Sequence, residues 1–208
     1  MIKLKCVLLF LLFLTLSSCS SVQMNKEKKN DRDIKKIETA AVINAQLGLL
    51  YLDKHDISRA KQKLLLALEE APKLPEIWYA MGYFLETTGS KQEARTHYLK
   101  ALALAPKRGD VLNNYGTYLC RMGDYQGAIA QFTLAVKDPG YLEPAAAYEN
   151  AGLCAMKIPD QTLAANYFRL AIAQDPNRLV ASQELVKINQ NNSSGDDHEN
   201  LRLSSASN

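Results

Sequence analysis

The chain has 208 residues, of which 25 are basic and 22 are acidic, and its formal net charge is +3. Two of the basic residues lie in an N-terminal segment, 1–18, that we expect to be removed, which leaves 23 (25 − 2) against 22 and a net charge of +1. This near balance excludes the strongly basic surface on which nucleic-acid binding depends, and the remaining 190 residues (208 − 18) suffice for one domain with a continuous core.

Residues 1–18 have the pattern of a signal peptide. Lys3 and Lys5 give a positively charged start, and an almost unbroken apolar run follows from Cys6 to Leu16. The run is shorter than the roughly 18 apolar residues that a membrane-spanning helix needs. We therefore interpret this segment as a leader that directs export.

The leader ends in the sequence Leu16-Ser17-Ser18-Cys19. These residues resemble the bacterial lipobox, which implies that Cys19 carries fatty acids such as palmitate and becomes the first residue of the mature chain. Ordinary cleavage of the leader is the alternative. Ser20 stands where an aspartate would resemble the inner-membrane retention signal of many lipoproteins. The resemblance therefore favours a lipid anchor in the cell outer membrane, with the protein facing the periplasm.

Two polar segments flank the rest of the chain. Residues 19–33 are rich in charged side chains, so we expect a lipidated, flexible tether there. Residues 189–208 have too little apolar content to fold and are predicted to be a disordered tail. The folded domain is thus expected between them, at residues 34–188.

A repeat of 34 residues runs through this domain. Gly48 is followed by Gly82 after 34 residues (82 − 48), and alanines and prolines recur with the same step. The fourth copy follows after a step of 36 (152 − 116), which places a two-residue insertion within Pro139–Pro144. The landmarks are Gly48, Gly82, Gly116 and Gly152, then Ala60, Ala94, Ala128 and Ala164, then Pro72, Pro106 and Pro176.

Each landmark has a physical role in a pair of helices. Glycine and alanine lack bulk, so the two helices can cross closely, and large side chains four residues after each alanine fill the remaining space. Proline ends the second helix because it lacks the amide donor and restricts the residue before it. The pattern resembles the tetratricopeptide repeat, with a generic helical bundle as the alternative. It predicts an all-α superhelical solenoid of four helix pairs, at residues 41–74, 75–108, 109–144 and 145–178.

A capping helix is predicted after the fourth repeat, at residues 179–188. Its apolar residues suit a helix that covers the last repeat, as the end of a solenoid requires. They are Leu179, Val180, Leu185, Val186 and Ile188.

Two of the four cysteines remain once the leader and the lipidated residue are set aside. Cys120 and Cys154 would then share a compartment that oxidises thiols. The repeat register places them on the first helices of repeats three and four, which pack side by side. We predict a disulfide between them, and the alternative is a pair of small buried residues with free thiols.

The sequence offers no pattern typical of catalysis or cofactor binding. His55, His97 and His198 show no pattern of nearby cysteine or acidic residues at metal-ligand spacing. Nucleophile elbows, HExxH motifs and phosphate-binding loops are also absent from the sequence. We therefore predict a protein that is not an enzyme and that uses no cofactor, no metal, no small-molecule substrate and no nucleic acid.

The first helix of each pair is expected to line a concave groove, with repeat positions 2, 5, 9 and 12 facing into it. Repeat one supplies an apolar strip, repeat two supplies two tyrosines, and repeat three is more polar. Such a surface suits an extended or helical peptide whose apolar side chains dock while tyrosine hydroxyls contact its backbone. The alternative is that a helix at residues 33–40 covers the strip and makes it core. The predicted groove residues are Val42, Ala45, Leu49, Leu52, Tyr79 and Tyr83.

Two segments carry a closer resemblance than the repeat alone. NNYGTYLC at 113–120 and ENAGLC at 149–154, with PGYLEP at 139–144 between them, are similar to type IV pilus biogenesis lipoproteins of the PilF/PilW kind, also called pilotins. The resemblance implies an outer-membrane lipoprotein that binds the pilus secretin and promotes its outer-membrane localisation and multimer assembly, so that pili form. Several relatives carry six repeats, whereas the pattern here stops after four and a cap.

Two other functions remain compatible with the sequence. One is a tetratricopeptide scaffold for outer-membrane protein insertion, and the other is an adaptor or activator of peptidoglycan enzymes. Neighbouring pilus genes would favour the pilotin, and neighbouring cell-wall synthase genes would favour the last of these.

Overall fold

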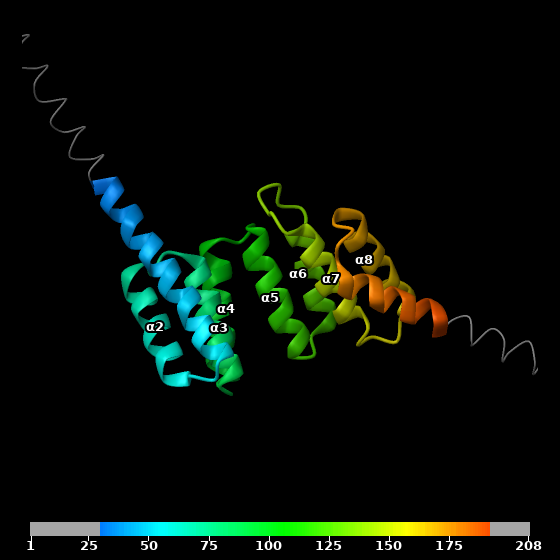
Figure 1. The fold of residues 1–208 in the computed structure, drawn as a ribbon, viewed down its shortest axis with the longest axis horizontal. Coiled ribbons are helices and arrows are strands. Elements are labelled where there is room, and N and C mark those ends of the chain that lie inside the picture. Colours follow the sequence, from blue (N-terminus) through cyan, green and yellow to red (C-terminus); the bar gives the residue numbers. More distant parts are fainter. Residues whose placement is uncertain (1–29, 192–208) are drawn as a thin grey trace, which may run out of the picture. The chain divides into compact units, whose positions relative to one another are not determined.

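The computed structural model describes residues 30–191, and within that range every regular element is a helix (Figure 1). The leader, Cys19, Ser20 and the tail from residue 192 lie outside the described residues. Contacts divide the chain into two compact units, Met1–Pro72 and Lys73–Asn208. Among the described helices, none is both long enough and apolar enough to cross a membrane.

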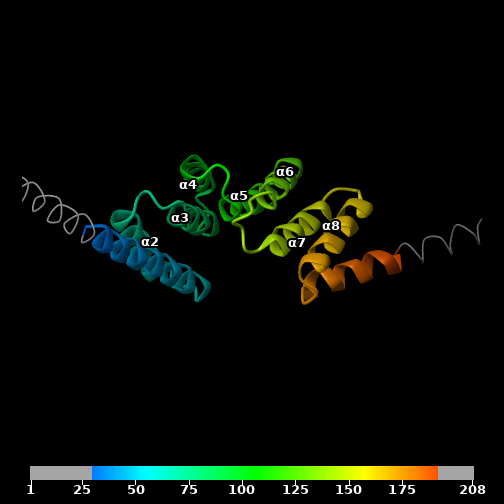
Figure 2. The same ribbon diagram turned by 90° about the horizontal axis from the view of Figure 1, so that it is seen from above.

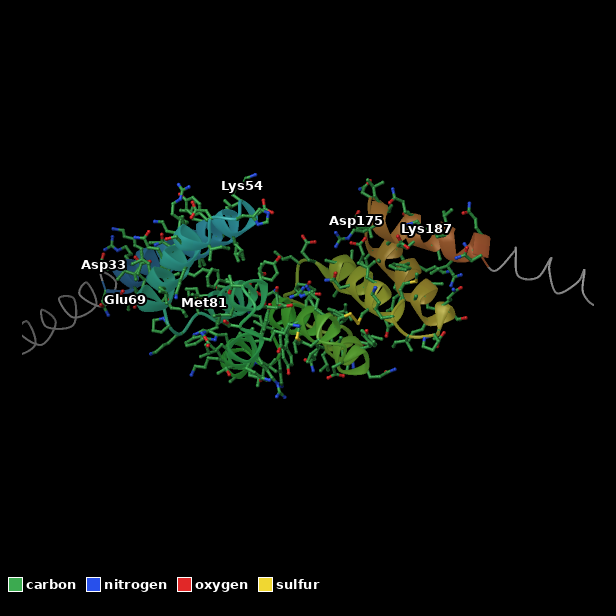
Figure 3. The ribbon with its side chains drawn as sticks, turned by 90° about the horizontal axis from the view of Figure 1, so that it is seen from below. Asp33, Lys54, Glu69, Met81, Asp175 and Lys187 are labelled. Atoms are coloured by element: carbon green, nitrogen blue, oxygen red, sulfur yellow. A yellow bond between two sulfur atoms is a disulfide. The ribbon has the colours of Figure 1, made fainter. Side chains whose placement is uncertain are left out.

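The described part of the first unit, residues 30–72, holds one antiparallel pair, made of a helix over residues 30–53 and α2 (Ile57–Glu70). Asp33 and Glu69 lie at one end of this pair and Lys54 lies at the other (Figure 3). The Asp56 carboxylate accepts a hydrogen bond from the Arg59 backbone N–H at 3.0 Å and so caps α2.

The first helix begins earlier than the sequence pattern indicated. Residues 30–33 are helical, so the predicted tether does not extend to residue 33 and the folded part begins before residue 34. Polar composition misled the prediction, because a helix with one exposed face tolerates charges. No proline interrupts residues 30–53, and the Thr39 hydroxyl bonds the Lys35 carbonyl oxygen at 2.7 Å.

The described part of the second unit, residues 73–191, consists of three helix pairs and a final helix. The members of each pair pack on each other, and the pairs follow one another along the unit (Figure 2). This arrangement confirms the predicted solenoid. The helices are α3 (Pro75–Thr87), α4 (Lys91–Leu104), α5 (Gly109–Arg121), α6 (Tyr125–Ala135), α7 (Pro144–Ala155), α8 (Gln161–Gln174) and a helix over residues 179–191.

The recurring glycines lie where two helices cross, as the sequence pattern predicted. A Cβ atom added to Gly116 would lie 2.8 Å from Phe132 Cε1 and 3.1 Å from the Ala128 carbonyl oxygen. At Gly152 it would lie 2.6 Å from Phe168 Cε1. Gly48 and Gly82 face Leu64 and Tyr98 in the same way. In each repeat, one large side chain of the second helix therefore packs directly against the glycine backbone of the first helix.

We expect Gly152→Ala to lower the free energy of unfolding by about 1–2 kcal/mol. Overpacking a close contact typically costs about 1–3 kcal/mol, which exceeds the gain of up to about 1 kcal/mol that alanine brings to a helix. Gly140→Ala is the control, because the nearest atom to its added Cβ is Asp138 Oδ1 at 3.3 Å on an exposed turn. Chemical denaturation of both variants checks this, and equal stability would contradict the crossing role.

The insertion before repeat four forms a long, anchored turn. It spans residues 136–143, where the corresponding turns span 71–74 and 105–108. Asp138 accepts hydrogen bonds from the backbone N–H groups of Gly109 and Gly140, at 2.7 and 2.9 Å, and these bonds lower the pKa of its carboxyl group. Tyr141 packs against Gly109, and burial raises the pKa of its hydroxyl to about 12. The turn is thus tied to the start of α5.

The last described helix is longer than predicted. It reaches residue 191 rather than 188, so residues 189–191 are not part of a disordered tail. Ala181 and Ile188 are buried in one cluster with Phe168, and Glu149 accepts a hydrogen bond from the Ala181 N–H at 3.1 Å. Val186 occupies the register position of the crossing glycines (152 + 34) and is 53% exposed. A valine there opposes the close crossing of another helix.

Candidate functional site

In the first unit, the predicted groove residues differ in accessibility. Ala45 and Leu52 are only 5% and 4% exposed, so they offer a partner almost no surface. Val42 and Leu49 are partly exposed. Residues 33–40 belong to the same continuous helix as this strip, so they do not cover it, although Ala45 and Leu52 are core residues as that alternative expected.

In the second unit, α3 presents the two predicted tyrosines differently. Tyr83 is 44% exposed, and its ring lies 5.5 Å from the Arg121 guanidinium carbon, within cation–π range. Tyr79 is half-buried, and its hydroxyl donates to Asp110 Oδ2 at 3.4 Å. Burial, with the Asp110 charge nearby, raises the pKa of the Tyr79 hydroxyl. Tyr83 is therefore the residue of this pair that is more available to a partner.

A charged cluster joins the starts of α3 and α5. Arg108 donates to Glu76 at 2.9 Å and makes two bonds to Asp110 at 2.7 and 2.8 Å. These bonds, led by those to Asp110, raise the pKa of Arg108, so the guanidinium stays protonated. Two acids and one arginine leave a small excess of negative charge at this end of the surface.

A second cluster joins the ends of the same helices. Arg121 donates to both oxygens of Glu86, with Nη2 at 2.7 Å from Oε2, and the Tyr98 hydroxyl donates to Oε2 at 3.2 Å. The Glu86 side chain is only 9% exposed and that of Arg121 is 39% exposed, so the carboxylate is sheltered from water whereas the guanidinium is partly solvated. Arg121 thereby holds Glu86 and the Tyr83 ring in fixed positions.

Repeat positions 2 and 12, which are expected to face the groove, correspond in repeat two to Glu76 and Glu86, but the sequence analysis missed the arginines that pair with these acids. A usable signal existed, because Arg108 and Arg121 follow their acids by about one repeat (108 − 76 = 32 and 121 − 86 = 35). Opposite charges at that spacing indicate ion pairs between neighbouring first helices.

The surface continues onto α5 and α7. Asn150 donates to Asn113 Oδ1 at 3.0 Å, and the Thr117 hydroxyl donates to the Asn113 carbonyl oxygen at 2.8 Å. Leu153 and Met156 on repeat four are each 39% exposed. They lie 36 residues after Thr117 and Cys120, at positions 9 and 12 of repeat four. The rule that repeat positions 2, 5, 9 and 12 face the groove would therefore have identified them. We define the second-unit docking face as Tyr79, Tyr83, Asn113, Thr117, Leu153 and Met156.

A disulfide between Cys120 and Cys154 joins α5 to α7 in the structure. The two α-carbons lie 5.8 Å apart, within the usual range of about 4.4–6.8 Å. Cys154 is fully buried, whereas Cys120 is partly exposed beside the docking face. The bond fixes the spacing of the two helices that carry Thr117 and Leu153.

The described residues carry side chains suited to binding another polypeptide. Within residues 30–191 no cluster of three or more histidine, cysteine or acidic side chains could hold a metal ion. His97 bonds the Glu93 carbonyl oxygen at 2.9 Å and its ring lies 5.4 Å from that of Trp78, while His55 lies in a turn at a φ of 58°. An exposed tyrosine, amide groups and two apolar side chains on rigid helices are the groups that bind polypeptides.

Comparison with known proteins agrees with this geometry. Tetratricopeptide-repeat families match residues 75–108, 97–130 and 116–178, so the chain is a tetratricopeptide-repeat protein, and all-α helix pairs are what that class requires. An uncharacterized protein of Haemophilus influenzae is 35% identical over 131 residues, covering 61% of this chain and 73% of the relative.

Two type IV pilus proteins are similar to most of the chain. The type IV pilus assembly protein PilF of Pseudomonas aeruginosa is 28% identical over 184 residues, covering 88% of this chain and 72% of PilF. The solved structure of P. aeruginosa PilF aligns with a TM-score of 0.69 at 28% identity, over 76% of this chain and 72% of that one. PilW, described as a widely conserved type IV pilus biogenesis factor, aligns with a TM-score of 0.65 at 28% identity, over 72% and 69%. The chain is thus a tetratricopeptide-repeat protein that is homologous to PilF and matches the solved structures of PilF and PilW.

Proposed function

We propose that this chain is a pilotin, an outer-membrane lipoprotein that binds the type IV pilus secretin and promotes its localisation and assembly into multimers. The similarity to PilF across 88% of the chain is the observation that carries the proposal. The role is non-catalytic, and the protein acts by holding a segment of the secretin.

The second-unit docking face supports this role by its chemistry. Tyr83, Leu153 and Met156 expose apolar surface, while Asn113 and Thr117 offer polar groups between them. An extended or amphipathic segment needs both kinds of contact, because its apolar side chains seek burial and its backbone seeks hydrogen bonds. Val42 and Leu49 of the first unit add partly exposed apolar surface to the same protein.

Rigidity also supports a binding role. The Cys120–Cys154 disulfide and the pair between Arg121 and Glu86 hold the first helices in place before any partner arrives. Binding then costs less conformational entropy than it would on a mobile surface.

We expect Tyr83→Ala and Leu153→Glu to abolish secretin multimers while the protein stays folded. Tyr83 and Leu153 are 44% and 39% exposed, so neither change breaks the core. Losing an anchor side chain at the centre of an interface typically costs about 2 kcal/mol or more of binding free energy. The measurement pairs thermal melting with gels of secretin multimers from cells that carry each variant.

Leu99→Glu is the matched control, because Leu99 is 41% exposed but lies on the second helix α4. It should leave multimers intact. Normal multimers in both test variants would remove this face from the mechanism, and equal loss in the control would show a defect unrelated to the face.

A further inference from the structure

Two asparagine side chains meet between the first helices of repeats three and four. Asn150 Nδ2 on α7 donates to Asn113 Oδ1 on α5 at 3.0 Å. This single bond leaves the Asn113 amino group, a donor, and the Asn150 carbonyl oxygen, an acceptor, without a partner among residues 30–191. The pair therefore holds a free donor and a free acceptor side by side.

Both free groups can be reached from solvent. Asn113 and Asn150 are half-buried, and in the described part of the chain Arg178 Nε is the only buried side-chain nitrogen or oxygen that lacks a hydrogen-bond partner. The Asn113 amino group and the Asn150 carbonyl oxygen must therefore lie at the surface. Leu153, which is 39% exposed, follows Asn150 by one turn of α7, so the amide pair borders apolar surface.

The charged side chains around the amide pair bind one another. The pairs are Arg108 with Glu76 and Asp110, Arg121 with Glu86, and Arg178 with Glu149. Together they leave little net charge on the first helices of the second unit. A partner segment is therefore recognised here through uncharged groups, namely its backbone amides and its apolar side chains.

An amino group beside a carbonyl oxygen complements one residue of an extended chain. In a β-strand, the N–H and C=O of one residue point to the same side, so such a residue can exchange two hydrogen bonds with a partner. In the interior of a helix both groups already bond within the helix. The free groups of Asn113 and Asn150 thus favour an extended segment over a helical one, with alternate side chains directed at exposed Tyr83 and Leu153.

We propose that Asn113 and Asn150 form a clamp for the backbone of an extended partner segment, in which Asn113 Nδ2 donates to the carbonyl oxygen of one partner residue and Asn150 Oδ1 accepts from the N–H of the same residue. This inference rests on the proposed function, because the partner is the secretin, and it adds the form in which the secretin segment binds.

Ester substitution in the backbone of a secretin peptide tests the clamp. Overlapping synthetic peptides that span the secretin are titrated onto the purified mature protein in detergent, and fluorescence anisotropy identifies the tightest binder. Each amide of that peptide is then replaced in turn by an ester, which removes the N–H donor and weakens the carbonyl acceptor. We expect replacement at one position to weaken binding to the wild type about tenfold, as is usual when a hydrogen-bond partner is lost from an interface.

The variant Asn150→Ala removes the acceptor of the clamp. It should bind the parent peptide about tenfold less tightly, and the sensitive ester should then cause no further loss. Asn114→Ala is the matched control, because Asn114 is also half-buried on α5 but donates to the Asp110 carbonyl oxygen at 2.8 Å. This control should keep the full ester effect. An ester effect of equal size in the wild type and in Asn150→Ala would overturn the proposal.

The variant Asn113→Asp separates binding from structure. Its carboxylate can still accept the bond from Asn150, so the melting temperature should change little. It has no donor and repels a carbonyl oxygen, so binding of the parent peptide should fall at least about tenfold. Unchanged binding would overturn the clamp, as would NMR chemical shifts of a labelled peptide that show a helix in the complex.

The same titrations distinguish failure of the clamp from failure of the proposed function. A secretin peptide that binds but has no sensitive ester position would overturn the clamp and leave the pilotin role intact. A wild-type protein that melts normally but binds no secretin peptide would overturn both.

Discussion

Reduction of the Cys120–Cys154 disulfide is expected to lower the melting temperature of the protein by roughly 10 °C. The bond joins residues 34 apart, and closing a loop of that length stabilises the folded state by up to roughly 4 kcal/mol in the chain-entropy model. For a domain of this size, each kcal/mol shifts the melting temperature by about 2–4 °C. Calorimetry with and without reductant measures the shift.

The double variant Cys120→Ala with Cys154→Ala is the control, because its melting temperature should not respond to reductant. Mass spectrometry after alkylation without reductant should find neither thiol of the wild type modified. Modification of both would show that the bond is absent in solution.

Cys19→Ser is expected to detach the protein from the membrane or to leave an uncleaved precursor. Cys19 lies outside the described residues, and the expectation follows from the lipobox resemblance. About three acyl chains, with about 0.8 kcal/mol for each buried methylene, make spontaneous release of the lipidated form negligible. Fractionation of cells into soluble and membrane pools therefore gives nearly all-or-none results.

The neighbouring change Ser20→Ala is the matched control and should leave the protein in the membrane fraction. Growth with a labelled fatty acid provides a second measurement. A mature wild-type protein that incorporates no label would refute the anchor.

The helix pairs could be predicted from the sequence because their cause is local and repeated. Gly116 and Phe132, or Gly152 and Phe168, meet because a bare backbone in one helix accepts a large side chain of the next. That requirement fixes residue types at fixed spacing, so it is visible without coordinates. The same register placed Cys120 and Cys154 on adjacent helices, where their α-carbons lie 5.8 Å apart.

Other features depend on contacts that the 34-residue repeat pattern does not predict. Arg108 binds Glu76 and Asp110 across a helix boundary, and Asp138 caps α5 from a turn 29 residues later (138 − 109). The early start of the first helix was missed because its first turns expose Ile34 and Ile37 and bury little. Val42, Ala45, Leu49 and Leu52 were treated as one strip, but burial varies along a helix. Of these four residues only Val42 and Leu49 are partly exposed.

The links between the first helices of the second unit differ in kind, and this has a mechanical consequence. α3 and α5 are joined by ion pairs of Arg108 and Arg121, whereas α5 and α7 share a covalent bond. Under load, ion pairs can slide and re-form, but a disulfide can only stretch or break. Repeats three and four therefore behave as a stiff block, and the unit bends first between repeats two and three. A force applied through a bound partner would strain that joint before it strained the surface bearing Thr117 and Leu153.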